Sequence, residues 1–164
     1  MAEERLWAPW RLEYIKGPKG GECIFCVGSD PGDDRAKYVV RRGEHCFAIL
    51  NKYPYNNGHL MVAPFRHVPS IEELNEAELL ELMTLTQESL AALREAYQPE
   101  GFNLGVNQGK IAGAGVEDHV HMHVVPRWGA DTNYMPVIGD TRVLPQSLDD
   151  SFDDITRAFS VAAR

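Results

Sequence analysis

Three histidines alternate with apolar residues in one short run of this sequence, which reads His119-Val-His-Met-His-Val-Val125. In a β-strand, residues two apart point to the same face, so His119, His121 and His123 are expected to form a row of imidazoles. Such a row suits two kinds of chemistry. It can hold zinc with a metal-bound water, or it can supply a neutral imidazole as a nucleophile.

A glycine-rich loop precedes the histidines. Gly109, Gly113 and Gly115 permit a close approach of the backbone, and successive N–H groups in such a loop can bind phosphate oxygens. By itself a glycine-rich loop indicates little more than a turn. Next to a row of imidazoles, it favours chemistry at phosphorus.

Two cysteines, Cys23 and Cys26, lie within a segment rich in glycine, proline and aspartate, residues 17–34. A pair with this spacing is typical of half a zinc site or of a redox pair. The chain has three cysteines, an odd number, which argues against a disulfide framework. Because the N-terminus also lacks a basic-then-apolar leader, we expect a cytoplasmic protein. Cys46, within an apolar run, is expected to be an inert buried thiol.

Short β-branched and apolar runs bounded by turn residues predict strands at 38–42, 46–51, 59–64, 102–106 and 119–125. The close spacing of the first three favours an antiparallel meander. Capping motifs followed by apolar residues at helical spacing predict a helix over 75–97. A further helix is expected after the N-cap signal at Ser147.

The charge of the chain limits its partners. Its 164 residues include 16 lysines and arginines and 24 aspartates and glutamates, a net charge of −8. Residues 1–70 carry ten basic and eight acidic side chains, and residues 71–164 carry six and sixteen. This balance argues against a nucleic-acid strand or an acidic membrane as partner, and no apolar run approaches the ~20 residues of a membrane helix. A small polyphosphate in a local pocket remains compatible with it.

The run of histidines resembles the defining motif of the histidine-triad (HIT) family, and Asn51 followed by Gly58-His-Leu-Met-Val-Ala-Pro64 resembles that family's second landmark. The resemblance covers roughly residues 20–128. It implies an α+β fold with an antiparallel sheet of about five strands, one long helix and a C-terminal helix, usually as a homodimer. We expect a single domain over 1–164, with an N-terminal extension (1–35), a core (36–128) and a C-terminal tail and helix (129–164).

The family's enzymes are nucleotidyl transferases and hydrolases that act on the α-phosphate of a nucleotide. By resemblance, His121 is the nucleophile that forms a nucleotidyl-imidazole intermediate, and His123 and His59 bind or polarise phosphate oxygens. Asn51 would contact the ribose. The residues expected to line the phosphates are Asn107, Gly113, Ala114, Gly115 and Val116.

Family members with a comparable cysteine pair also carry a histidine shortly after the second landmark, here His67. Together with His119, the resemblance therefore implies a zinc site formed by Cys23, Cys26, His67 and His119. Two thiolates and two imidazoles are a closed ligand set, which leaves no position for a reactive water. The zinc is accordingly expected to be structural.

One departure distinguishes this sequence from the common triad hydrolases, which carry a Gly-Gln-Ser/Thr segment before the first histidine. Here the segment 112–118 lacks that glutamine. With the aromatic segment 6–15 and the run 125–131, the chain resembles the bacterial branch that includes diadenosine tetraphosphate phosphorylases, in which inorganic phosphate is the second nucleophile. Lys110 and Arg127 are further candidates for phosphate contacts.

The resemblance predicts cleavage of dinucleoside polyphosphates by phosphorolysis. Hydrolysis of dinucleoside polyphosphates or of adenylyl-amines is the alternative within the family. A noncatalytic nucleotide-binding module and a zinc-dependent redox protein are alternatives of other classes.

Overall fold

The computed structural model describes residues 23–129, 131 and 144–162, and the aromatic segment 6–15 lies outside them. An antiparallel sheet of five strands forms the framework, in the order β1-β2-β3-β5-β4. The strands are β1 (Val39–Arg42), β2 (Cys46–Leu50), β3 (Leu60–Pro64), β4 (Gly101–Val106) and β5 (Met122–Arg127). The predicted α+β class and the predicted meander of the first three strands are confirmed.

The long helix α3 (Glu76–Tyr97) begins at a capping box, in which the Asn75 side chain accepts from the Glu78 backbone N–H and the Glu78 carboxylate accepts from the Asn75 N–H. The helix predicted over 75–97 is confirmed. The other helical elements are α2 (Asp34–Lys37), α5 (Leu148–Ala162) and the 3-10 turns η1 (Pro31–Asp33), η2 (Ile71–Glu73) and η3 (Lys110–Ala112). The sequence did not predict α2.

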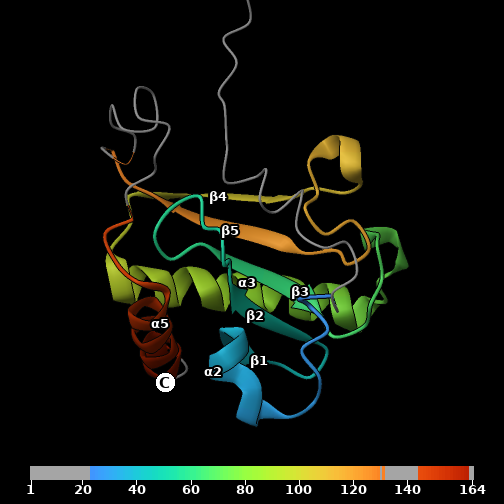
Figure 1. Ribbon diagram of the computed structural model, residues 1–164, viewed down its shortest axis with the longest axis horizontal. Helices are drawn as coiled ribbons and strands as arrows, with labels where there is room; N and C mark the ends of the chain where they lie inside the picture. The colour runs from blue at the N-terminus through green and yellow to red at the C-terminus, as the bar shows by residue number, and fades with distance from the viewer. Residues whose placement is uncertain (1–22, 130, 132–143, 163–164) are drawn as a thin grey trace, which may run out of the picture.

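Figure 1 shows α3 running along one face of the sheet, with α5 against its end and near β1. This face holds the larger apolar core, to which α5 contributes Phe152, Ile155 and Phe159. A smaller cluster on the opposite face includes Phe25 and Val27 from the N-terminal loop. Because α3 occupies one face, the other face is the one on which side chains can surround a ligand. Among the described residues no helix is long and apolar enough to cross a bilayer.

The strand predicted over 119–125 begins later than expected, at Met122. Its pairing with β3 ends at Val62↔Met122. Beyond this point the Pro64 carbonyl accepts from the His119 ring at 2.8 Å, and the Val120 backbone N–H donates to Val68 O. Hydrogen bonds outside the ladder therefore replace strand pairing at the first two histidines.

Candidate active site

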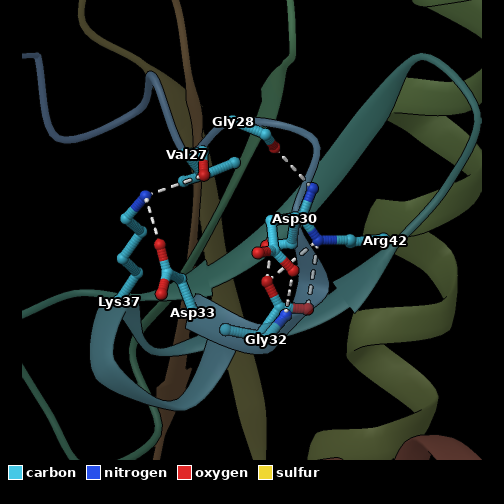
Figure 2. A network of polar contacts seen from close by, with 8 residues as sticks. Val27, Gly28, Asp30, Gly32, Asp33, Lys37 and Arg42 are labelled. Carbon is cyan, nitrogen blue, oxygen red and sulfur yellow. Dashed lines mark hydrogen bonds and ion pairs between the residues drawn. The ribbon is translucent and has the colours of Figure 1, made fainter.

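The N-terminal loop that carries the cysteine pair is fastened to the sheet by a network of polar contacts (Figure 2). The Arg42 guanidinium, from β1, donates to both oxygens of Asp34 at 2.7–3.0 Å and to the carbonyl of Gly28 at 2.8 Å. The Lys37 ammonium donates to the carbonyl of Val27 at 2.9 Å. These contacts fix the loop beside the sheet face that α3 leaves uncovered.

Four potential metal ligands converge from three parts of the chain. The ligand atoms of Cys23, Cys26, His67 and His119 all lie within 4.8 Å of one another. The Nδ1 atom of His119 is 3.5 Å from the Cys23 sulfur, and that of His67 is 3.4 Å from the Cys26 sulfur. A tetrahedral zinc with bonds of about 2.3 Å to sulfur and about 2.0 Å to nitrogen separates such atoms by about 3.5 Å. The donor set and its spacing therefore fit zinc.

The tautomer of His119 also suits a metal ligand. Its Nε2 lies 2.8 Å from the Pro64 carbonyl oxygen, which can only accept, so Nε2 carries the proton. Nδ1 then presents its lone pair beside the Cys23 sulfur. A ligating histidine commonly donates its other ring N–H to a carbonyl in this way, which fixes the orientation of the ring.

Phe25, between the two cysteines, packs against two of the three triad rings. Its ring centroid is 4.5 Å from that of His121, with the planes 27° apart, and 5.3 Å from that of His119. A backbone hydrogen bond of 2.9 Å from Cys26 N to Cys23 O closes the turn that carries it. The loop that carries the two cysteines thus covers one face of the His121 ring through Phe25 and joins the candidate metal site to the candidate nucleophile.

The protonation of His121 is set by its backbone neighbour. Its Nδ1 donates to the carbonyl oxygen of His119 at 2.8 Å, which leaves the lone pair on Nε2. Burial lowers the pKa of His121 below its ordinary value, so the ring is neutral at pH 7. A neutral imidazole with its lone pair on a fixed atom is the form required of a nucleophile.

Two successive hydrogen bonds fix the tautomer of His123. The Tyr55 backbone N–H donates to Nδ1 of His59 at 3.0 Å, so the proton of His59 is on Nε2 and is donated to Nδ1 of His123 at 2.9 Å. Burial, aided by the neighbouring imidazoles, lowers the pKa of His59 to about 3 and that of His123 to about 4. Both rings are therefore neutral at pH 7, and His123 carries an N–H on Nε2 that can donate to a ligand oxygen.

A cavity of about 470 Å³ lies on this face of the sheet. His121 and His123 line it, together with apolar side chains of β2 and β3 and several tyrosines. Of the other residues expected at the nucleotide, those that also line it are Asn51, Gly113, Gly115 and Val116. Its size is within the range of small-molecule sites, and its lining of apolar side chains with several polar groups suits a nucleotide.

A family model described as the HIT domain matches residues 34–129 of the chain. The chain belongs to the HIT family. The AP-4-A phosphorylase of Mycobacterium tuberculosis is 39% identical over 163 residues, which cover 90% of this chain and 80% of that protein. The bis(5'-adenosyl)-triphosphatase of Dictyostelium discoideum is 36% identical over 84 residues, which cover 51% of this chain and 56% of that one.

Solved structures of other HIT proteins have the same fold. A histidine triad nucleotide-binding protein from Sulfolobus tokodaii superposes with a TM-score of 0.68 at 25% identity, covering 87% of this chain and 95% of that one. A zinc-bound histidine triad family protein from Mycobacterium smegmatis gives a TM-score of 0.65 at 24% identity, covering 85% and 94%. The HIT fold predicted from the sequence is thus confirmed.

Three residues expected at the phosphates do not line the first cavity. His59 is fully buried and donates to His123, so it can act on a phosphate only through that ring. Asn107 lines a second cavity, which shares His123 and Tyr55 with the first. Ala114 lines neither cavity, although Gly113 and Gly115 on either side line the first.

Asn51 has a structural task as well as a place at the cavity. Its side-chain oxygen accepts from the Tyr53 backbone N–H at 2.9 Å, which forms a turn, and its amide nitrogen is 3.4 Å from Nδ1 of His59.

Sequence reasoning missed two residues of the candidate site, Phe25 and Tyr55. The phenylalanine was visible between the two cysteines, but only the fold shows that it reaches His121.

Proposed function

We propose that this HIT domain cleaves dinucleoside polyphosphates, such as diadenosine tetraphosphate, through a covalent nucleotidyl-His121 intermediate. The observation that carries the proposal is the state of His121, which is neutral, holds its proton on Nδ1 and lies at the wall of a nucleotide-sized cavity beside His123. The glycine-rich segment that lines the same cavity supplies a backbone able to lie close to phosphate oxygens.

In the first step the lone pair on Nε2 of His121 attacks the α-phosphorus, and the bond from phosphorus to the bridging oxygen breaks. The leaving polyphosphate takes that electron pair. Positive charge develops on the His121 ring, and the existing hydrogen bond from Nδ1 to the His119 carbonyl stabilises it without any rearrangement. The Nε2–H of His123 donates to an oxygen at the reacting phosphate.

In the second step an oxygen of inorganic phosphate attacks the nucleotidyl group, and the bond between phosphorus and His121 breaks. The electron pair returns to Nε2, which restores the neutral ring. With diadenosine tetraphosphate the first step releases ATP and the second yields ADP. If water replaces phosphate, the second product is AMP.

Relatives support the phosphorolytic form of this reaction. The M. tuberculosis protein named AP-4-A phosphorylase matches 90% of the chain, whereas the triphosphatase of D. discoideum matches 51%. A noncatalytic nucleotide-binding module has less support, because such a module does not need a neutral imidazole held with its lone pair at the cavity wall. A redox role of the cysteines is also less well supported, since each sulfur lies beside a histidine nitrogen at zinc-ligand spacing.

We further propose a structural zinc bound by Cys23, Cys26, His67 and His119, supported by the spacing of their ligand atoms. The zinc would hold the N-terminal loop, and with it Phe25, against the triad. None of the three cysteines forms a disulfide, which is compatible with the proposed cytoplasmic location. The family resemblance supports a homodimer.

The products formed from diadenosine tetraphosphate test this function. Incubation with inorganic phosphate is expected to give ATP and ADP, and chromatography of the nucleotides identifies them. If phosphate is omitted, ADP should be absent and AMP should form slowly. Equal yields of ATP and AMP with or without phosphate would show a hydrolase instead, and an unchanged substrate would show that the chain only binds nucleotides.

A further inference from the structure

A second cavity, of about 390 Å³, lies beside the first on the same face of the sheet. Its floor is formed by β4 and β5, where Gly105 pairs with His123 and Asn103 pairs with Val125. Gly105 has no side chain, and the space above it is open. The missing side chain at Gly105 therefore leaves open space beside His123.

His123 and Tyr55 line both cavities, whereas His121 lines only the first. The row of imidazoles thus leads from the first cavity to the boundary with the second. The centroids of the His121 and His123 rings are 4.8 Å apart, so a phosphate attacked by His121 is within reach of groups at this boundary.

The chemistry of the second cavity differs from that of the first. Besides His123 and Tyr55, its polar lining includes the amides of Asn56, Asn103 and Asn107 and the guanidinium of Arg127. The guanidinium is held in place, because Asp131 accepts from Nε and Nη2, and Asn103 accepts from Nη1 at 2.7 Å. The Arg127 side chain is 46% exposed, while that of Asp131 is 8% exposed. The carboxylate is therefore covered, and the guanidinium keeps an accessible edge.

Displacement at phosphorus is in line, so the leaving group departs on the side opposite to the attacking nitrogen. A nucleophile that attacks the nucleotidyl-histidine in turn must approach from that same side. If the transferred nucleotide lies in the first cavity against His121, the second cavity is open to the polyphosphate, because His123 lines both cavities.

We propose that the second cavity holds the leaving nucleoside polyphosphate in the first step and the incoming inorganic phosphate in the second. This inference rests on the proposed nucleotidyl transfer and assigns a place to its second reactant. Arg127 and Asn107 donate to the phosphate oxygens there. By holding phosphate at the position that water would otherwise occupy, the cavity favours phosphorolysis over hydrolysis.

The ratio of ADP to AMP formed from diadenosine tetraphosphate tests the proposal, because each nucleotidyl-enzyme formed ends as one or the other. In Arg127→Met the concentration of inorganic phosphate that gives equal ADP and AMP should rise at least about tenfold, the loss expected for one charge-assisted hydrogen bond. Asn107→Ala removes a donor for which no partner among the described residues competes, and should raise that concentration in the same direction. Arg157→Met, which removes an exposed arginine of α5, is the matched control and should leave it unchanged.

An unchanged ratio in both Arg127→Met and Asn107→Ala would overturn the assignment of the second cavity. That result is distinct from failure of the proposed function, which would appear as absence of both ADP and AMP with the unmodified protein. If the two variants lower only the total turnover and leave the ratio of ADP to AMP unchanged, the result also counts against the proposal. Phosphate and water would then still compete for the nucleotidyl-enzyme as in the unmodified protein.

Discussion

Replacing His121 with alanine is expected to lower kcat for diadenosine tetraphosphate by at least about 10⁴-fold, a loss typical of removing a covalent nucleophile. Without Nε2, no other imidazole among the described residues that line the cavity offers a free lone pair, since His123 carries its proton on Nε2. His121→Gln, which keeps more of the side-chain volume against Phe25, should be equally inactive. Product formation measured by chromatography and the thermal unfolding curve together separate loss of chemistry from loss of fold.

His45→Ala is the matched control for this loss. His45 lies in the turn between β1 and β2, where its backbone N–H donates to Glu81 and its carbonyl accepts from the Phe65 N–H. Its side chain lines neither cavity, so the variant should retain full activity. Retention of more than a few per cent of kcat in both His121 variants would exclude His121 as nucleophile. The reaction would then have to proceed by direct attack of phosphate or water.

Loss of zinc is expected to have the largest effect on stability. The purified protein should contain about one zinc per chain, and Cys23→Ser should contain none, as measured by atomic emission. A ligand that binds only the folded state at 1,000 times its Kd stabilises it by about 4 kcal/mol. The free energy of unfolding of Cys23→Ser should therefore fall by about this amount, and kcat should fall as well because the loop that carries Phe25 is released.

Cys46→Ser controls for the substitution itself. Cys46 is fully buried beneath α3, and burial raises the pKa of its thiol to about 12, as expected of an inert residue. This variant should keep its zinc. A metal-free unmodified protein, or a Cys23→Ser variant with unchanged stability, would contradict the structural role of the metal.

Local signals explain why much of the fold was predictable. The helix over 76–97 follows from a capping box and apolar spacing, both of which are properties of neighbouring residues. The strands of the meander likewise follow from short apolar runs between turns. The start of β5 was not predictable in this way. It depends on two hydrogen bonds between segments distant in the chain, from the His119 ring to the Pro64 carbonyl and from the Val120 N–H to the Val68 carbonyl.

The candidate site was predictable as a set of residues but not as an arrangement. Alternation placed His121 and His123 side by side, and the resemblance to the HIT family selected the four candidate zinc ligands. The burial of His59 behind His123, the stacking of Phe25 and the second cavity at Asn107 each join segments distant in the chain. No local pattern encodes such contacts.

The negative charge of the chain does not conflict with a polyphosphate ligand. The acidic side chains of α3 lie on the helix that covers the opposite face of the sheet from His121. None of the described residues that line the two cavities is an aspartate or a glutamate, and Lys37, Lys52 and Arg127 are among them. A small nucleotide can therefore bind to an acidic protein.

The most direct measurement is the mass of the enzyme during its first turnover. Enzyme in excess over diadenosine tetraphosphate, without inorganic phosphate, is quenched in denaturant at alkaline pH, digested and mapped by mass spectrometry. We expect one adenylyl group on His121, which disappears as ADP forms when phosphate is added before the quench. Formation of AMP with no adduct, or an adduct on any other residue, would contradict the covalent mechanism.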